Sequence, residues 1–160
     1  MTLAHLHLLL NHFPILGSIF LSVLFIVALI YKNVFLQKVI LWFLVAIALL
    51  TAVTYLTGDP TVRAVHGLPG VSEDMIRQHE LFAKFGLGLM FVTGILALGG
   101  ALFYSRKPRL PRAFLSVILI ILLLNSALFT YIGLLGGLIL HQEIRTPTSL
   151  HLVLKHQSAL

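Results

Sequence analysis

The sequence predicts an all-α fold, an integral membrane four-helix bundle with both termini on the outer, periplasmic side, and three observations lead to it. Hydrophobic residues make up 59% of the 160-residue chain and charged residues only 10%, whereas soluble domains carry about 25% charged residues. Four apolar stretches each approach the length of about 20 residues that crosses a bilayer. The Lys and Arg residues that have no acidic residue near them in the sequence all fall on one predicted side of the membrane. We therefore expect a single transmembrane domain over residues 1–160.

The four predicted helices follow these apolar stretches. They cover residues 13–31, 34–57, 72–104 and 112–143, followed by an outer tail at 144–160. The first helix begins at Pro14, because proline suits the first helical position, or residues 3–11 are helical as well and Pro14 bends the join. The sequence leaves both interpretations open.

Turn and cap signals separate the second helix from the third. The stretch 58–72 contains Asp59-Pro60 and Gly67-Leu68-Pro69-Gly70, so we expect a loop there. Ser72 is a good N-cap for the third helix. Acidic residues follow it directly and suit the positive end of the helix dipole.

The charges predict the orientation in the membrane. One side has no acidic residue and holds six cations: Lys32, Lys38, Arg106, Lys107, Arg109 and Arg112. The other side has five cations and five acids, so the whole net charge of +6 lies on the first side. By the positive-inside rule that side faces the cytoplasm, which predicts a multi-pass protein of the bacterial inner membrane. The charge therefore follows topology and does not indicate nucleic-acid binding.

The first basic residue is Lys32, so the chain lacks the basic start of a cleavable secretion signal. We therefore expect the first apolar stretch to be a retained span. The chain has no cysteine, which excludes c-type heme attachment, cysteine-ligated iron–sulfur clusters, thiolate zinc sites and disulfides.

Histidines are the most informative residues, because all eight fall on the predicted outer side. They are His5, His7, His12, His66, His79, His141, His151 and His156. Imidazole is the commonest metal and heme ligand among side chains, and a histidine inside a membrane is costly unless it has a partner. A histidine cluster at one end of an apolar bundle therefore indicates a cofactor site.

Position along the helices ranks these histidines. His12, His79 and His141 lie at the mouths of three different helices, where ligation is favoured over a simple place among the headgroups. His5 shares a face with His12 if that segment is helical, whereas His7 points elsewhere and is equally compatible with either role. The remaining three are better explained as loop or tail residues.

Glycines accompany two of these histidines. Gly86 lies on the face of His79, seven residues further on, and Gly133 and Gly137 form one stripe with His141. A missing side chain beside a histidine leaves room for a flat macrocycle, but the same spacing also permits close helix packing. The two explanations have equal weight for the stripe that includes His141.

Several short motifs resemble a widespread bacterial family of uncharacterised four-helix membrane proteins. They are His5-Leu-His7, Asn11-His12-Phe13-Pro14, Thr57-Gly58-Asp59-Pro60, His79-Glu80 and Gly136-Gly137. The architecture also resembles four-helix b-type cytochromes, which hold heme between histidines of different helices. Many such cytochromes have hemes near both membrane faces, whereas the inner half of this chain has no histidine.

We therefore expect an electron-transfer subunit with one heme b or two near the outer face, and no catalytic activity of its own. The expected axial pairs are His12 with His79, and His141 with His5. Arg63, Arg77, Lys84 or Arg145 would meet heme propionates. The expected partners are lipid, other membrane subunits of a respiratory or photosynthetic complex, and a quinol or periplasmic cytochrome; nucleic acid is not among them.

Two other hypotheses remain open on the sequence. The first is a structural or assembly subunit without a cofactor, in which the apolar helices face partner subunits. The second is a site for copper, zinc or iron that uses the same histidines as ligands. Three methionines add little support for copper, and no acidic chain crosses the membrane, which disfavours a cation transporter.

Overall fold

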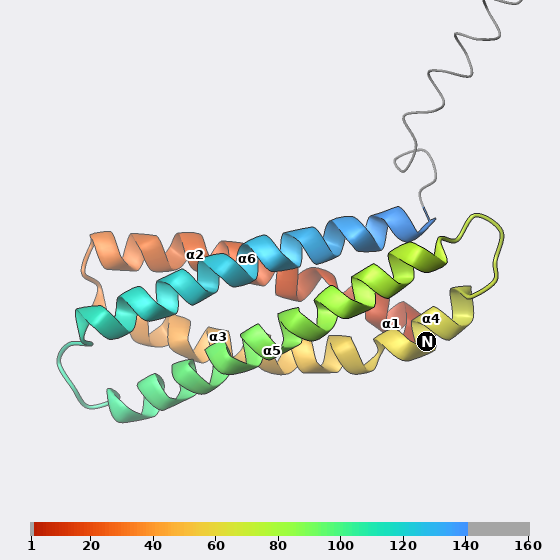
Figure 1. Cartoon of the computed structure of the whole chain (residues 1–160). Helices are drawn as coiled ribbons and strands as arrows, with labels where there is room; N and C mark the ends of the chain where they lie inside the picture. Colours follow the sequence, from red (N-terminus) through yellow and green to blue (C-terminus); the bar gives the residue numbers. More distant parts are fainter. Residues whose placement is uncertain (1, 141–160) are drawn as a thin grey trace, which may run out of the picture.

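The computed structural model describes residues 2–140, and this part of the chain is entirely helical apart from its turns and short connections (Figure 1). The helices are α1 (Leu3–Leu10), α2 (His12–Ile30), α3 (Val34–Leu56), α4 (Gly58–Val65), α5 (Glu73–Phe103) and α6 (Arg112–Leu140). Four helical segments are long and apolar enough to cross a membrane: Leu3–Ile30, Val34–Val65, Glu73–Phe103 and Arg112–Leu140. The predicted all-α class and the four span-like helices are therefore confirmed.

The four long helices form a closed bundle in which each one packs against two others. α2 contacts α3 and α6, and α5 also contacts α3 and α6, so α2 and α5 lie diagonally across the bundle. The centre is filled by fully buried side chains such as Phe25, Leu44 and Leu122. Many large apolar side chains face outward instead, as expected of helices whose surroundings are lipid or other apolar helices.

The N-terminal segment is helical, which answers a question the sequence leaves open. α1 starts after Thr2, whose hydroxyl accepts a hydrogen bond from the backbone N–H of His5. Asn11 separates α1 from α2, and Pro14 falls in the first turn of α2, where the missing N–H of proline has no helical partner to lose. A helix therefore lies on each side of Asn11.

The connection after α3 contains more helix than the sequence predicts. Residues expected to form a loop build α4, with Asp59 in its first turn. Pro60 is compatible with this helix because it also lies in the first turn. The predicted turn follows: Gly70 has a φ of 86° and Val71 donates its N–H to the carbonyl of Leu68 at 3.2 Å, which matches a type II turn with Pro69 and Gly70 at its centre.

The start of α5 agrees with its predicted cap. The hydroxyl of Ser72 accepts a hydrogen bond from the backbone N–H of Met75, and Glu73 and Asp74 occupy the first turn. The peptide N–H of Ser72 donates to the carbonyl of Ile139 at 3.0 Å. This bond joins the start of α5 to the far end of α6.

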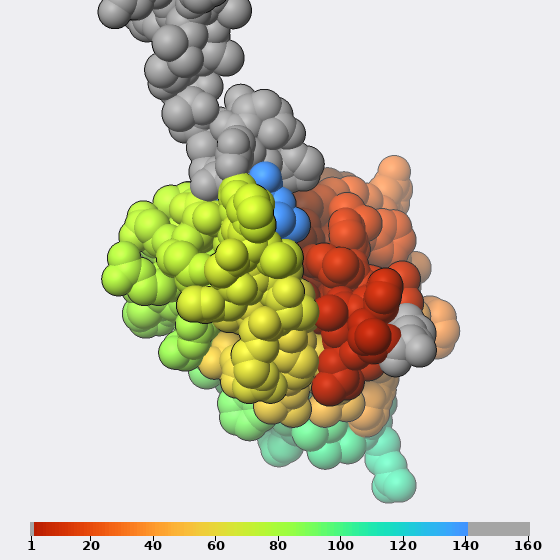
Figure 2. Space-filling model, turned by 90° about the vertical axis from the view of Figure 1, so that its right-hand side faces the viewer, coloured from red at the N-terminus to blue at the C-terminus, as the bar shows by residue number. Residues whose placement is uncertain are grey.

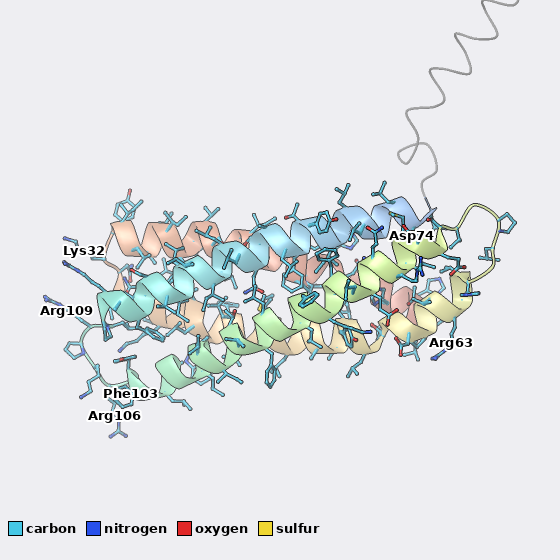
Figure 3. The ribbon with its side chains drawn as sticks, viewed as in Figure 1. Lys32, Arg63, Asp74, Phe103, Arg106 and Arg109 are labelled. Atoms are coloured by element: carbon cyan, nitrogen blue, oxygen red, sulfur yellow. The ribbon has the colours of Figure 1, made fainter. Side chains whose placement is uncertain are left out.

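The two ends of the bundle differ in their polar residues (Figure 3). Lys32, Arg106 and Arg109 lie at one end, which we call the basic end, and Arg63 and Asp74 lie at the other. The second end also carries α1 and α4, and we call it the histidine end. Figure 2 looks onto it and shows α1, in red, beside α4, in yellow, and the two helices are in contact. They extend α2 and α3 at this end of the bundle.

Candidate functional site

The histidines within residues 2–140 belong to elements of the histidine end. His5 and His7 lie in α1, His12 opens α2, His66 ends α4, and His79 lies in the second turn of α5. The three others, His141, His151 and His156, lie outside the described residues. Only two of the described histidines, His7 and His79, are half-buried against a neighbouring long helix.

His79 connects α5 to α6. Its Nδ1 lies 3.0 Å from the backbone oxygen of Ile132. Gly136 lies beside the ring, since a Cβ at this position would stand 3.3 Å from Cε1 and 3.4 Å from Nδ1 of His79. Such a Cβ would crowd the imidazole. The missing side chain of Gly136 therefore provides the room in which the ring reaches the Ile132 carbonyl.

His7 connects α1 to the last turn of α3. Its Nδ1 lies 2.9 Å from the backbone oxygen of Thr54 and 3.2 Å from the hydroxyl of Thr57. The hydroxyl of Thr54 in turn lies 3.4 Å from the backbone oxygen of Leu10, near the end of α1. These contacts hold α1 against the end of α3.

The two hydrogen bonds determine which ring nitrogen is available for a ligand. A backbone carbonyl can only accept a hydrogen bond, so the Nδ1 atoms of His7 and His79 must carry the proton. The lone pair of each neutral ring is then on Nε2. Histidines that bind metals usually have this arrangement, with the other ring nitrogen donating to a carbonyl or carboxylate.

Of the expected pair, His79 is half-buried whereas His12 is exposed. His12 belongs to α2, diagonal to α5, and its side chain is exposed, with Nδ1 at 3.2 Å from the carbonyl of Leu8. His5 is exposed as well and interacts with the hydroxyl of Thr2 at 2.6 Å. The partner expected for His5, His141, lies outside the described residues.

His7 makes an interhelical contact that the sequence does not predict. The contact depends on the packing of α1 against α3, which joins residues 47 positions apart. No pattern within α1 reveals this contact. The threonines at 54 and 57 are a partial signal, because two polar residues one turn apart near a helix end indicate a polar contact there.

The glycines proposed to clear space for a macrocycle have different surroundings. A Cβ on Gly86 would stand 2.7 Å from Cδ1 of Ile132, and a Cβ on Gly133 would stand 2.8 Å from Cδ1 of Ile15. Both positions are therefore occupied by close helix packing. Gly137 has no atom within 4 Å of a Cβ built on it, so it alone of these three keeps open space beside it.

Two of the four cations expected to meet propionates have partners of their own, and a third, Arg145, lies outside the described residues. Lys84 pairs with Glu80 at 3.0 Å and Arg77 pairs with Asp74 at 2.9 Å, in both cases within α5 and at exposed positions. Exposed pairs of this kind exchange partners easily. They are therefore compatible with an anionic group at the histidine end without requiring one.

Chemically, the site offers two imidazole nitrogens and an amide oxygen. The amide oxygen is Oδ1 of Asn11, which is buried at the break between α1 and α2 and has no hydrogen-bond partner. Within residues 2–140, no group of three or more His, Asp or Glu side chains is arranged to hold a metal ion. A bare zinc or copper ion needs three or four protein ligands, whereas heme iron needs only its axial ligands from the protein. The donor set therefore fits heme better than a bare metal ion.

Comparisons with protein-family models, curated proteins and solved structures find no match to this chain.

Proposed function

We propose that the four span-like helices cross the bacterial inner membrane with the histidine end on the periplasmic side. The support is the charge at the basic end, where six cations have no acidic neighbour in the sequence. Lys38 is held there by the carbonyls of Ser105 and Lys107, at 2.9 and 2.8 Å. Cations retained on short connections are typical of cytoplasmic loops.

We further propose that the chain is a b-type cytochrome-like electron-transfer subunit with heme at the histidine end. The observation that carries this proposal is that His7 and His79 each donate Nδ1–H to a backbone carbonyl of a neighbouring helix, which leaves Nε2 free for iron. When bound, the heme supplies one-electron redox chemistry. His7 and His79 would hold the heme iron.

With both His7 and His79 holding the iron, neither oxygen nor a substrate would bind to it. This coordination suits electron transfer rather than catalysis. The contacts at the site also favour it, because rings held by interhelical hydrogen bonds need little rearrangement when the charge on the iron changes. A quinol or a periplasmic carrier would be the exchange partner, and the exposed apolar faces of the helices would contact other membrane subunits.

The test is heme binding by purified full-length protein expressed with ample heme. We expect a reduced-minus-oxidised spectrum of a six-coordinate b-type heme, and loss of at least nine-tenths of the heme in His7→Ala and His79→Ala. His66→Ala and His5→Ala are matched controls that should keep it, since both residues are exposed. Retention of heme by His7→Ala with loss in His12→Ala would restore the pair His12 and His79. A protein without any Soret band would overturn the proposal.

The competing function is a structural or assembly subunit without a cofactor. The same two hydrogen bonds favour it, because His7 joins α1 to α3 and His79 joins α5 to α6, as polar side chains between membrane helices often do. Under this function, replacing His12, His79 and His141 together should leave the activity of the partner complex intact. Under the cytochrome function it should abolish electron transfer through the subunit.

A further inference from the structure

The apolar core of the bundle is divided into two clusters by polar residues. The cluster nearer the basic end includes Phe25, Leu44 and Leu122, and the cluster nearer the histidine end is built on Met90 and Phe129. Between them lies a polar layer to which α2, α5 and α6 contribute: Ser18, Ser22, Thr93, Asn125 and Ser126. Polar groups in such a place are costly unless each has a hydrogen-bond partner.

The hydroxyl groups of the polar layer already donate their hydrogens to other acceptors. Within the layer, each hydroxyl lies within hydrogen-bond distance of a backbone carbonyl of its own helix: Ser18 of Ile15, Ser22 of Ser18, Thr93 of Leu89 and Ser126 of Leu122. The hydroxyls of Ser22 and Ser126 also lie 2.9 Å apart, so one of them donates its hydrogen to the other. A hydroxyl has one hydrogen to give. None of these groups therefore has a hydrogen left for the side chain of Asn125.

Asn125 has both amide hydrogens in use and one acceptor without a partner. Its Nδ2 donates to the hydroxyl oxygen of Thr93 at 2.8 Å and to the carbonyl of Ile121 at 3.0 Å. Rotating the amide by half a turn would set Oδ1 against the Ile121 carbonyl, and two acceptors repel each other. The orientation is therefore determined by these contacts, and Oδ1 is fully buried with no donor.

We infer that the polar layer binds a buried water molecule that donates a hydrogen bond to Oδ1 of Asn125. The required ligand is a small neutral donor, because the layer contains no carboxylate that would attract a cation. Buried waters typically make about three hydrogen bonds to polar groups that lack partners. The hydroxyl oxygens of the layer retain lone pairs that can accept the second hydrogen of the water.

The experiment is water-to-protein magnetisation transfer by solid-state NMR on the full chain in lipid bilayers. Asparagine-selective labelling gives three side-chain signals, from Asn11, Asn33 and Asn125. We expect magnetisation transfer from water to the side chain of Asn125, although this residue lies in the membrane interior. The exposed Asn33 is the positive control. Absence of transfer to Asn125 when Asn33 shows it would overturn the inference.

A variant tests the assignment to Oδ1. In Asn125→Leu, with threonine labelling, the transfer to Thr93 should fall several-fold relative to the unaltered protein, because the water has lost its principal acceptor. Thr130, which is exposed, provides a reference signal that the substitution should not change. An unchanged transfer to Thr93 would contradict the assignment of the water to Asn125.

Discussion

The most direct test of the candidate site is the substitution Gly136→Ala. A Cβ at 136 would stand 3.3 Å from Cε1 and 3.4 Å from Nδ1 of His79, so the imidazole must move by a few tenths of an ångström. The bond from Nδ1 to the Ile132 carbonyl is 3.0 Å long, and such a shift takes it beyond the usual range of about 2.7–3.2 Å. We expect this hydrogen bond to be lost.

The magnitude follows from comparison with Gly137→Ala. Both variants replace glycine by alanine in adjacent positions of α6, so the gain in helix propensity is similar in both and cancels in the difference. Only Gly136 has the His79 ring within reach, because nothing lies within 4 Å of a Cβ at 137. A typical hydrogen bond contributes about 0.5–1.5 kcal/mol. Gly136→Ala should therefore be less stable than Gly137→Ala by about this amount, or about two- to thirteen-fold in the unfolding equilibrium.

The assay is reversible unfolding of both variants in the same detergent or bicelle system, followed by heme titration. We expect Gly136→Ala to have both the lower unfolding free energy and the weaker heme binding, because the His79 ring is no longer held by Ile132. Equal stability of the two variants would refute the packing argument. A stability difference with equal heme affinity would retain the packing argument and refute the role of His79 as a ligand.

Two further predictions concern the bundle and its orientation. Gly94→Ala should destabilise the protein by about 1–3 kcal/mol, because its Cβ would lie 2.6 Å from Cβ of Ala48 and push α5 away from α3. The control in the same unfolding assay is Gly99→Ala, since no atom lies within 4 Å of a Cβ at that position. Equal stability of the two variants would contradict the prediction. Because the chain has no cysteine, Leu68→Cys should react with an impermeant thiol reagent in intact cells and Ser105→Cys should react only after lysis; the reverse pattern would invert the proposed topology.

Local signals in the sequence were enough to predict much of the fold. Ser72 caps α5 as its position before two acidic residues predicts, and the turn at Pro69-Gly70 has the positive φ that glycine permits. Helical structure at α4 was missed, because Asp59-Pro60 indicates a turn in isolation and is equally suited to the first turn of a helix. Such ambiguity is resolved by the neighbouring chain, here by contact of α4 with α1.

The candidate site depended more strongly on tertiary structure. The sequence by itself determined the helical class, the four apolar spans and the segregation of histidines from the uncompensated cations, because these properties depend on composition and order along the chain. Tertiary packing decided that His7 has an interhelical partner whereas His12 is exposed, since that outcome depends on how α1 packs against α3 and meets Thr54. Tertiary packing also decided which glycine lies beside the His79 ring. The rotation of α6 about its axis places Gly136 there and turns Gly133 towards α2.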